Sequence, residues 1–152
     1  MPTQQRPAGK DPYITLHWWV EVEGLVVANF AECSGLTLET EFYEYRQGGV
    51  NTHVLKFPGP SKYSNLVLRR GMTDNKKLWE WYLQVVRLGQ QKKEIRKSIN
   101  VMLFDYSSQE PVQRWTFVRA FPVKWVGPEF RADAASMAIE TLEFAHEGLS
   151  QT

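Results

Sequence analysis

Hydrophobic and polar residues alternate along most of the chain, and this period of two predicts β-strands. The first alternating stretch, HWWVEVEGLVVANF at residues 17–30, is interrupted at Glu23 and Gly24, which is typical of a hairpin turn. Residues 65–71 predict a further short strand. Residues 98–106, SINVMLFDY, are apolar on both faces, so this segment is expected to be a central strand covered on each side.

The two last predicted strands contain irregularities. Within residues 112–126, VQRWTFVRAFPVKWV, Pro122 predicts a bend or an edge position. In residues 136–149, SMAIETLEFAHEGL, the apolar phase changes: Met137 and Ile139 occupy one face, and Leu142 and Phe144 the other. A bulge near Glu140-Thr141 would rotate the strand and keep both pairs inside.

Residues 73–88 carry the pattern of a helix. Apolar side chains recur there at spacings of three and four, at Leu78, Trp81, Tyr82, Val85 and Leu88. Thr73 or Asp74 is the expected N-terminal cap, and Gly89 the expected end. Short strands with one helix predict a mainly β fold, a small barrel or sandwich with a flanking helix.

A long predicted ribbon has no clearly apolar face. Residues 34–47, SGLTLETEFYEYRQ, and residues 50–57, VNTHVLKF, are joined by a turn at Gly48 and Gly49, and prolines at 58 and 60 are expected to end the second run. Charged and aromatic side chains occur on both faces. Because the edges of a ribbon expose unpaired backbone groups, this pattern favours a subunit of a larger assembly.

Length and charge narrow the function classes. The chain has 152 residues, enough for one domain, and we expect a loosely ordered segment at 1–15 followed by a single domain at 16–152. There are 18 Lys and Arg against 17 Asp and Glu, giving a net charge of +1, so no overall charge attracts nucleic acid or an anionic membrane. No apolar run is long enough to span a membrane, and no signal peptide is recognisable. Synthesis in the cytoplasm is expected.

The charges are nevertheless unevenly distributed. No Lys or Arg occurs from Asp11 to Tyr45, whereas seven acidic residues do. A basic segment begins at the end of the predicted helix, with Arg87, Lys92, Lys93, Arg96 and Lys97. The two regions are either separate solvated surfaces or complementary surfaces through which copies of the chain meet. The second interpretation makes Lys92, Lys93, Arg96 and Lys97 a basic patch between subunits.

Candidate chemistry is sparse. His17, His53 and His146 lack neighbouring ligands at metal-binding spacing, so neither a metal nor a cofactor is expected. The single cysteine, Cys33, has no adjacent base, and Glu39 with Glu41 share a strand face that nothing encloses. The loop PGPSKYSN at 58–65 lacks the spacing of a phosphate-binding loop. Aromatic and basic residues do not interleave as in a single-strand nucleic-acid platform. We therefore expect a protein without catalytic residues.

Six ordered segments carry a family resemblance: FAECSGL, EYRQGGVN, KFPGPSKYSNLVLRRGMTD, LWEWY, AFPVKWVGPEF and IETLEFAHEGL. Together, between Trp18 and Leu149, they resemble the tail tube proteins of contractile phage tails and of phage-derived contractile injection systems. The resemblance implies two packed antiparallel sheets that form a barrel-like body, one flanking helix and a long hairpin at about 37–57 that reaches neighbouring subunits.

The resemblance also implies a function and partners. Six copies would close a ring, and stacked rings would form a hollow inner tube. A sheath would surround the tube, a baseplate or hub would support its first ring, and a cap or terminator would close its other end. The lumen would hold effector or DNA cargo. The expected inter-subunit hairpin residues are Glu39, Glu41, Tyr43, Tyr45, Arg46, Gly48, Gly49 and His53. Such a particle could be released from the cell.

Three alternatives remain open from the sequence. The chain could be the main tube subunit or a tube-initiator paralogue that forms the first ring on the baseplate. The assembly could be a phage tail or an injection system. A rival from another class is a monomeric β-barrel that binds a small ligand among its tryptophans, and it predicts a buried apolar cavity.

Overall fold

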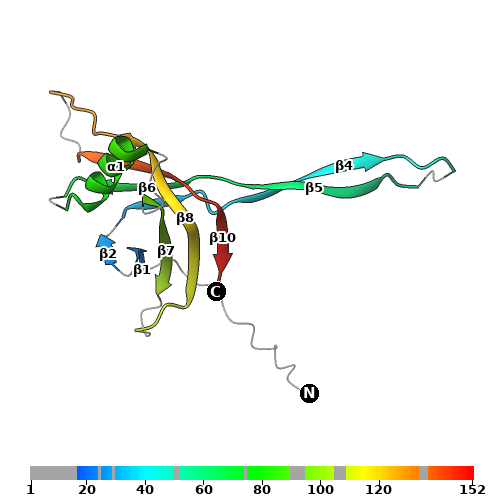
Figure 1. The fold of residues 1–152 in the computed structure, drawn as a ribbon, viewed down its shortest axis with the longest axis horizontal. Coiled ribbons are helices and arrows are strands. Elements are labelled where there is room, and N and C mark those ends of the chain that lie inside the picture. The colour runs from blue at the N-terminus through cyan, green and yellow to red at the C-terminus, as the bar shows by residue number, and fades with distance from the viewer. Residues whose placement is uncertain are drawn as a thin grey trace, which may run out of the picture.

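A ribbon of two strands projects from a body of two sheets and one helix (Figure 1). The computed structural model describes residues 17–23, 25–28, 30–49, 52–73, 75–89, 95–104, 109–133 and 137–152. Its elements are β1 (His17–Val22), β2 (Leu25–Ala28), β3 (Glu32–Ser34), β4 (Leu38–Tyr45), β5 (Leu55–Tyr63), β6 (Leu66–Gly71), α1 (Lys77–Leu88), β7 (Lys97–Phe104), β8 (Gln113–Val126), β9 (Ile139–Ala145) and β10 (Gly148–Gln151).

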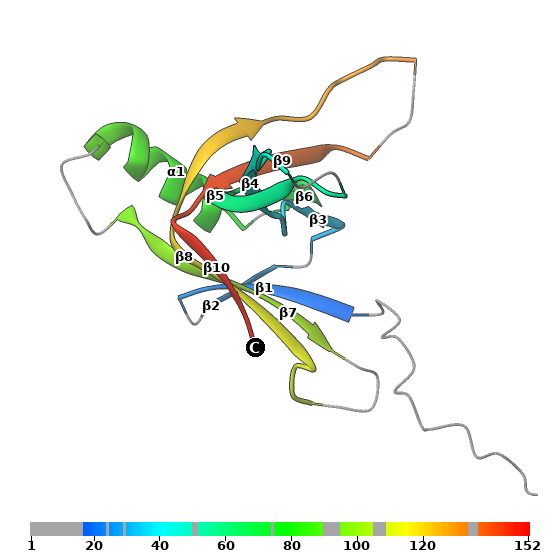
Figure 2. The ribbon, with the colours of Figure 1, turned by 90° about the vertical axis from the view of Figure 1, so that its right-hand side faces the viewer.

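The two sheets of the body are antiparallel and share β8, so their strands follow one continuous order, β2-β1-β7-β8-β9-β6-β3. Strand β8 belongs to two sheets: its first part pairs with β7 on one side and β10 on the other, and its last part pairs with β9. The strand order begins at β2 and ends at β3, so the sheet does not close into a barrel within one chain. The prediction of a mainly β fold of two packed antiparallel sheets with one flanking helix is confirmed, and Figure 2 shows the body end-on.

The core lies between the two sheets and the helix. Its largest fully buried side chains come from five strands and include Phe117, Phe144, Leu66, Leu68, Ile99, Leu142 and Val20. Trp81 of α1 packs with its ring centroid 5.5 Å from that of Phe144 and donates its indole N–H to the carbonyl of Ile95 at 2.7 Å. The apolar stripe of the helix is therefore a core face, as the sequence pattern indicates.

Strand β8 bends where it changes partners. Arg119 has a φ of 51°, and the pairing with β9 shifts register between Pro122 and Lys124. Proline cannot donate to a ladder, so it suits the point at which one pairing stops and another starts. The bend predicted at Pro122 is confirmed.

The bulge predicted in β9 near Glu140-Thr141 is wrong. Strand β9 pairs with β6 in one continuous register from Ile139 to Phe144. Met137 is 77% exposed, and Glu140 occupies the inward phase together with the two buried apolar residues that follow it on that face. The apolar pattern changes phase because the first inward-facing position of β9 is occupied by the carboxylate Glu140 and not by an apolar residue.

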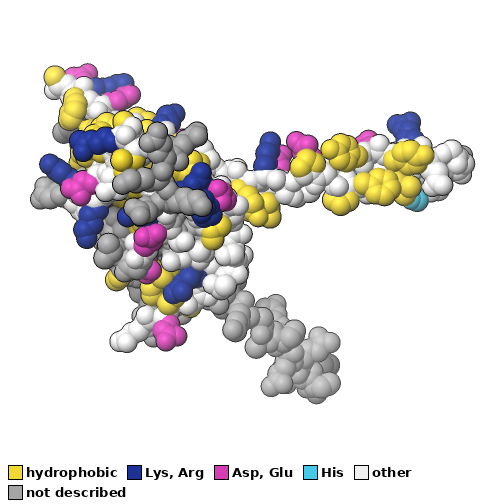
Figure 3. All heavy atoms as spheres, viewed as in Figure 1, with side chains coloured by type: hydrophobic (Ala, Val, Ile, Leu, Met, Phe, Trp, Pro, Cys, Tyr) yellow, Lys and Arg dark blue, Asp and Glu magenta, His cyan; other side chains and the backbone are white. Residues whose placement is uncertain are grey.

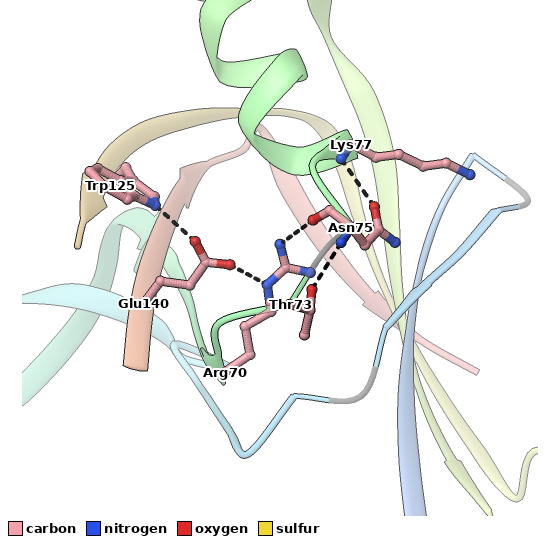
Figure 4. Close-up of polar contacts among 6 residues, drawn as sticks. All are labelled: Arg70, Thr73, Asn75, Lys77, Trp125 and Glu140. Atoms are coloured by element: carbon pink, nitrogen blue, oxygen red, sulfur yellow. Dashed lines mark hydrogen bonds and ion pairs between the residues drawn. The ribbon is translucent and has the colours of Figure 1, made fainter. Parts of the chain in front are cut away.

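A buried polar network holds Glu140 in the core (Figure 4). Its carboxylate accepts a hydrogen bond from Nε of Arg70 and a second, at 3.0 Å, from the indole N–H of Trp125. Arg70 also donates from Nη2 to the carbonyl of Asn75 at 3.2 Å, and its guanidinium lies 5.4 Å from the ring centroid of Phe30. Both side chains are almost fully buried, so each charge compensates the other in a part of the core from which water is excluded.

The same network positions the start of the helix, which differs from the prediction. Helix α1 begins at Lys77, whose N–H donates to the side chain of Asn75 at 3.0 Å. Thr73 accepts a hydrogen bond from the N–H of Asn75 instead of capping the helix, and Asp74 lies outside the described residues. Gly89 ends the helix as predicted, with a φ of 52° and its N–H bonded to the carbonyl of Val85.

Strand β5 also differs from the prediction, because it continues through Pro58 and Pro60 to Tyr63. Pro58 lies opposite Phe42, and the register shifts next to it, between Thr40 and Phe42. Every second N–H of a two-stranded ribbon points away from the partner strand, and a bulge frees further positions. A ribbon therefore tolerates prolines that a central strand would exclude.

Candidate assembly interface

The β4-β5 ribbon is the most exposed part of the described structure. Its two strands pair only with each other and extend away from the body (Figure 1). Large apolar side chains are exposed along it, as Figure 3 shows, namely Leu38, Phe42, Tyr43, Tyr45, Phe57 and Tyr63. An exposed apolar surface of this kind usually marks a binding site for another protein.

The strand register shows which residues of β5 share each face of the ribbon with the residues of β4. Tyr43 lies opposite Phe57, and Tyr45 lies opposite Leu55, so these four side chains share one face of the outer half of the ribbon, here called the aromatic face. The opposite face carries Phe42 with Pro58 and Glu44 with Lys56. There the Lys56 ammonium lies 5.2 Å from the ring centroid of Phe42.

The predicted hairpin residues all lie on this ribbon or at its tip. Tyr43 and Tyr45 are on the aromatic face. Glu39 faces Lys62, with Nζ and Oε2 3.8 Å apart, and Glu41 lies at the register shift. The tip residues Arg46, Gly48, Gly49 and His53 are exposed, and Gly49 has a φ of 92° that suits a turn. The prediction that they contact another subunit stays a prediction.

The base of the ribbon is fixed by a close backbone approach. Gly35 has a φ of 96°, and a Cβ atom there would overlap the carbonyl oxygen of Asn65. Only glycine combines that φ with that contact. Next to it, the N–H of Ser64 donates to the carbonyl of Thr37 at 3.2 Å, and the amide of Asn65 donates to Glu143 at 2.9 Å.

His146 connects the ribbon base to the body. Its Nε2 lies 2.8 Å from the carbonyl oxygen of Ser64, and its Nδ1 lies 3.1 Å from that of Gly148. The imidazole packs edge-on against Phe117, with ring centroids 4.8 Å apart, and also contacts Tyr63. This histidine thus has a structural position, at the junction of β5, β9 and β10.

An apolar groove of about 470 Å³ opens between β3 and the sheet formed by β1, β7 and the first part of β8. Trp18 pairs with Leu103, and Trp115 pairs with Val101, so these four side chains continue the core face out to solvent. Leu36 and Cys33 contribute to the other wall. Sequence reasoning missed this groove, because its residues are dispersed over four strands.

Burial raises the pKa of the Cys33 thiol to about 11. A thiol with so high a pKa carries little thiolate near neutral pH, and the thiolate is the reactive form. Cys33 is therefore a poor nucleophile, in agreement with the absence of a neighbouring base in the sequence.

The predicted basic patch is only partly described. Lys92 and Lys93 lie outside the described residues. Arg96 pairs with Glu147 of its own chain at 2.7 Å, and its guanidinium lies 4.8 Å from the ring centroid of Phe121. Lys97 lies 5.7 Å from the ring centroid of Trp81. These intrachain contacts engage Arg96 and Lys97, so the role of the patch between subunits stays a prediction.

The described residues include no cluster of three or more His, Cys, Asp or Glu side chains that could hold a metal ion. Within the same part of the chain, no helix has the length and apolar character needed to cross a membrane.

Residues 14–150 match the model of the T4-like virus tail tube protein gp19 family. The chain belongs to this family. It is thus a structural subunit of a tube, as the ordered segments and the predicted fold indicate. No curated protein matches this tail tube protein significantly.

Solved structures support the same fold for this tail tube protein. A chain of the extracellular contractile injection system PVC, in its sheath-tube complex in the extended state, has a TM-score of 0.79 at 26% identity and covers 94% of this chain and 93% of its own. A chain of the PVC sheath/tube terminator structure reaches a TM-score of 0.81 at 26% identity, over 95% and 99% of the two chains. A chain of the anti-feeding prophage baseplate, solved with six-fold symmetry, has a TM-score of 0.81 at 24% identity, over 95% and 97%.

Proposed function

We propose that this tail tube protein is the repeating subunit of the inner tube of a contractile injection system, in which six copies close a ring and rings stack into a hollow conduit. The observation that carries the proposal is the projecting ribbon, which exposes its aromatic face and whose two strands pair with no other strand among the described residues. The 26% identity to chains of the PVC sheath-tube and terminator structures favours an injection system. The six-fold symmetry of the anti-feeding prophage baseplate supports the number of copies.

The expected partners follow from this role. A sheath surrounds the tube, a baseplate hub supports its first ring, and a cap or terminator closes it, in line with the similar chains found in sheath, terminator and baseplate structures. Effector or DNA cargo occupies the lumen. The subunit is made in the cytoplasm and leaves the cell as part of the particle. Its contribution is structural and involves no catalytic group.

Electron microscopy of the purified protein in negative stain tests the proposal. Rings or hollow rods are expected at high protein concentration and low salt. A monodisperse monomer under those conditions would overturn the proposal and favour the monomeric binding module, for which the apolar groove is the obvious site. Light scattering after size exclusion provides the independent mass.

The same preparation separates the main subunit from an initiator. A main tube subunit matches itself at both ends of the ring, so it forms rods longer than one ring. An initiator matches the tube at one end only and stops at single rings. Rods are the expected result.

A further inference from the structure

Both ring nitrogens of His146 face backbone carbonyl oxygens. Nε2 lies 2.8 Å from the carbonyl oxygen of Ser64, and Nδ1 lies 3.1 Å from that of Gly148. A carbonyl oxygen can only accept a hydrogen bond, and a neutral imidazole carries a proton on one nitrogen only. The neutral ring would therefore turn the lone pair of its other nitrogen toward an oxygen. Turning the ring over would put C–H groups at both places and lose both bonds. Only the imidazolium can donate to both carbonyls.

The two carbonyls belong to different parts of the chain. Ser64 follows the last residue of β5, and its N–H donates to the carbonyl of Thr37, just before β4, at 3.2 Å. Ser64 thus closes the base of the ribbon. Gly148 is the first residue of β10 and lies opposite Val118 of β8. His146 therefore ties the ribbon base to the ladder of β8 and β10, with Ser64 82 residues away in the sequence.

The surroundings of the ring suit a cation that can gain and lose its proton. The ring centroids of Phe117 and Tyr63 lie 4.8 Å and 5.6 Å from that of the imidazole. Aromatic rings attract cations at distances up to about 6 Å. His146 is only partly buried, so water can deliver and remove the proton.

No fixed negative charge holds the proton on the ring. Five titratable or charged side chains lie on the elements around this turn: Tyr63 on β5, Arg96 ahead of β7, Arg119 on β8, Glu143 on β9 and Glu147 in the turn itself. Glu147 is bound by both arginines, at 2.7 Å and 2.6 Å, and Glu143 accepts the amide of Asn65. Among the described residues, no carboxylate forms an ion pair with His146.

The net charge of this cluster opposes protonation only weakly. Glu147 and its two arginines leave one positive charge, but Arg96 and Arg119 are 31% and 51% exposed. Water screens charges at such positions, whereas the two carbonyl oxygens contact the ring directly. The hydrogen bonds therefore decide which form of the ring fits the site.

We infer that His146 is a proton-dependent fastener that ties the base of the ribbon to β10. The charge of histidine changes between about pH 5 and 8. At the acidic end of this range the ring makes both hydrogen bonds, and at the basic end it makes one. The contribution of the fastener is thus complete at low pH and is lost as the pH rises. The inference concerns a single chain and does not depend on the proposed function.

Hydrogen exchange followed by nuclear magnetic resonance tests the inference in dispersed protein. Two backbone N–H groups flank the ring: that of Ser64, bonded to Thr37, and that of Glu147, bonded to the carbonyl of Val118 at 3.0 Å. After correction for the intrinsic effect of pH on exchange, we expect the protection factors of both groups to fall between pH 5.5 and pH 8.0. The expected fall is roughly five- to tenfold, since a hydrogen bond stabilises a folded segment by about that factor.

Two substitutions separate His146 from other titrating groups. His146→Gln keeps a side-chain donor that does not titrate, so both protection factors should be equal at the two pH values. His53→Gln is the matched control, because His53 is exposed at the ribbon tip and its ring contacts Thr52; this variant should keep the fall. Equal protection at both pH values in the wild-type protein, or a fall that persists in His146→Gln, would overturn the inference.

The ring protons give a second test that requires no substitution. In wild-type protein labelled with ¹⁵N-histidine, His146 is assigned through its contact with Phe117. At pH 5.5 we expect two slowly exchanging ring N–H signals from His146, and at pH 8.0 one. The exposed ring of His53 should show none, because its protons exchange rapidly with water. Fewer than two protected ring N–H signals from His146 at pH 5.5 would also refute the inference.

Discussion

Two adjacent arginines of β6 provide a controlled test of the buried network. Arg69 pairs with Glu32 at 3.0 Å, with side chains 45% and 64% exposed, whereas Arg70 pairs with Glu140, with side chains 3% and 7% exposed. Replacing Arg70 by Met leaves the Glu140 carboxylate buried with only the Trp125 N–H as a partner. Breaking a buried ion pair by removing one partner costs about 3–5 kcal/mol, whereas an exposed pair contributes about 0–1 kcal/mol.

The expected result is a large difference between neighbouring positions. For a chain of this size, 1 kcal/mol corresponds to a Tm change of about 2–4 °C. Arg70→Met should therefore lower Tm by about 6–20 °C and Arg69→Met by no more than about 4 °C, measured by circular dichroism at a concentration that keeps the protein dispersed. The double variant Arg70→Met/Glu140→Leu should recover most of the lost Tm, because it removes both buried charges. A smaller cost of about 1 kcal/mol remains, because the indole N–H of Trp125 loses its acceptor. Equal Tm values for the two single variants would refute the assignment of Arg70 as the buried, structure-determining arginine.

Three further predictions address the ribbon, the groove and the basic segment. Gly35→Ala should destabilise the fold by at least about 2 kcal/mol, because a φ of 96° is strained for alanine and the new Cβ overlaps Asn65; an unchanged urea midpoint would contradict this. Iodoacetamide should alkylate Cys33 in dispersed protein roughly 200-fold more slowly at pH 8 than a free thiol of pKa 8.5, because only the thiolate reacts. The rate of alkylation should rise about tenfold per pH unit up to about pH 11. A rate that levels off near pH 9 would show an ordinary thiol. The double variant Lys92→Glu/Lys93→Glu should abolish the rods seen by electron microscopy and leave the circular dichroism spectrum unchanged. It reverses the charge of the basic patch and keeps the ion pair between Arg96 and Glu147. Intact rods would exclude the basic patch as a contact between subunits.

Much of the body could be predicted from the sequence, because its strands have clear local signals. The apolar run around Val101 predicted a central strand, and β7 does lie between β1 and β8. Pro122 predicted the bend in β8. The change of phase before Leu142 was also a real signal, but its cause was a carboxylate with a partner 70 residues away in the sequence. Such a partner cannot be read from local pattern.

The candidate interface was less predictable for a similar reason. The mixed pattern of the ribbon indicated an assembly surface, yet the separation of its faces depends on cross-strand register and on the shift between Thr40 and Phe42. Strand register also decides that Pro58 stays inside β5. The groove combines residues from four strands, and only the folded chain brings Trp18 and Trp115 to the same face.

Strand β8 gives the body a mechanical property. Its 14 residues cross both sheets without interruption, so the two sheets are joined by a covalent chain in addition to side-chain packing. Sliding one sheet over the other would require breaking the ladder hydrogen bonds on both sides of this strand at once. A pushing force that enters the subunit through one sheet therefore reaches the other with little shear, and this rigidity suits a structural subunit of a tube.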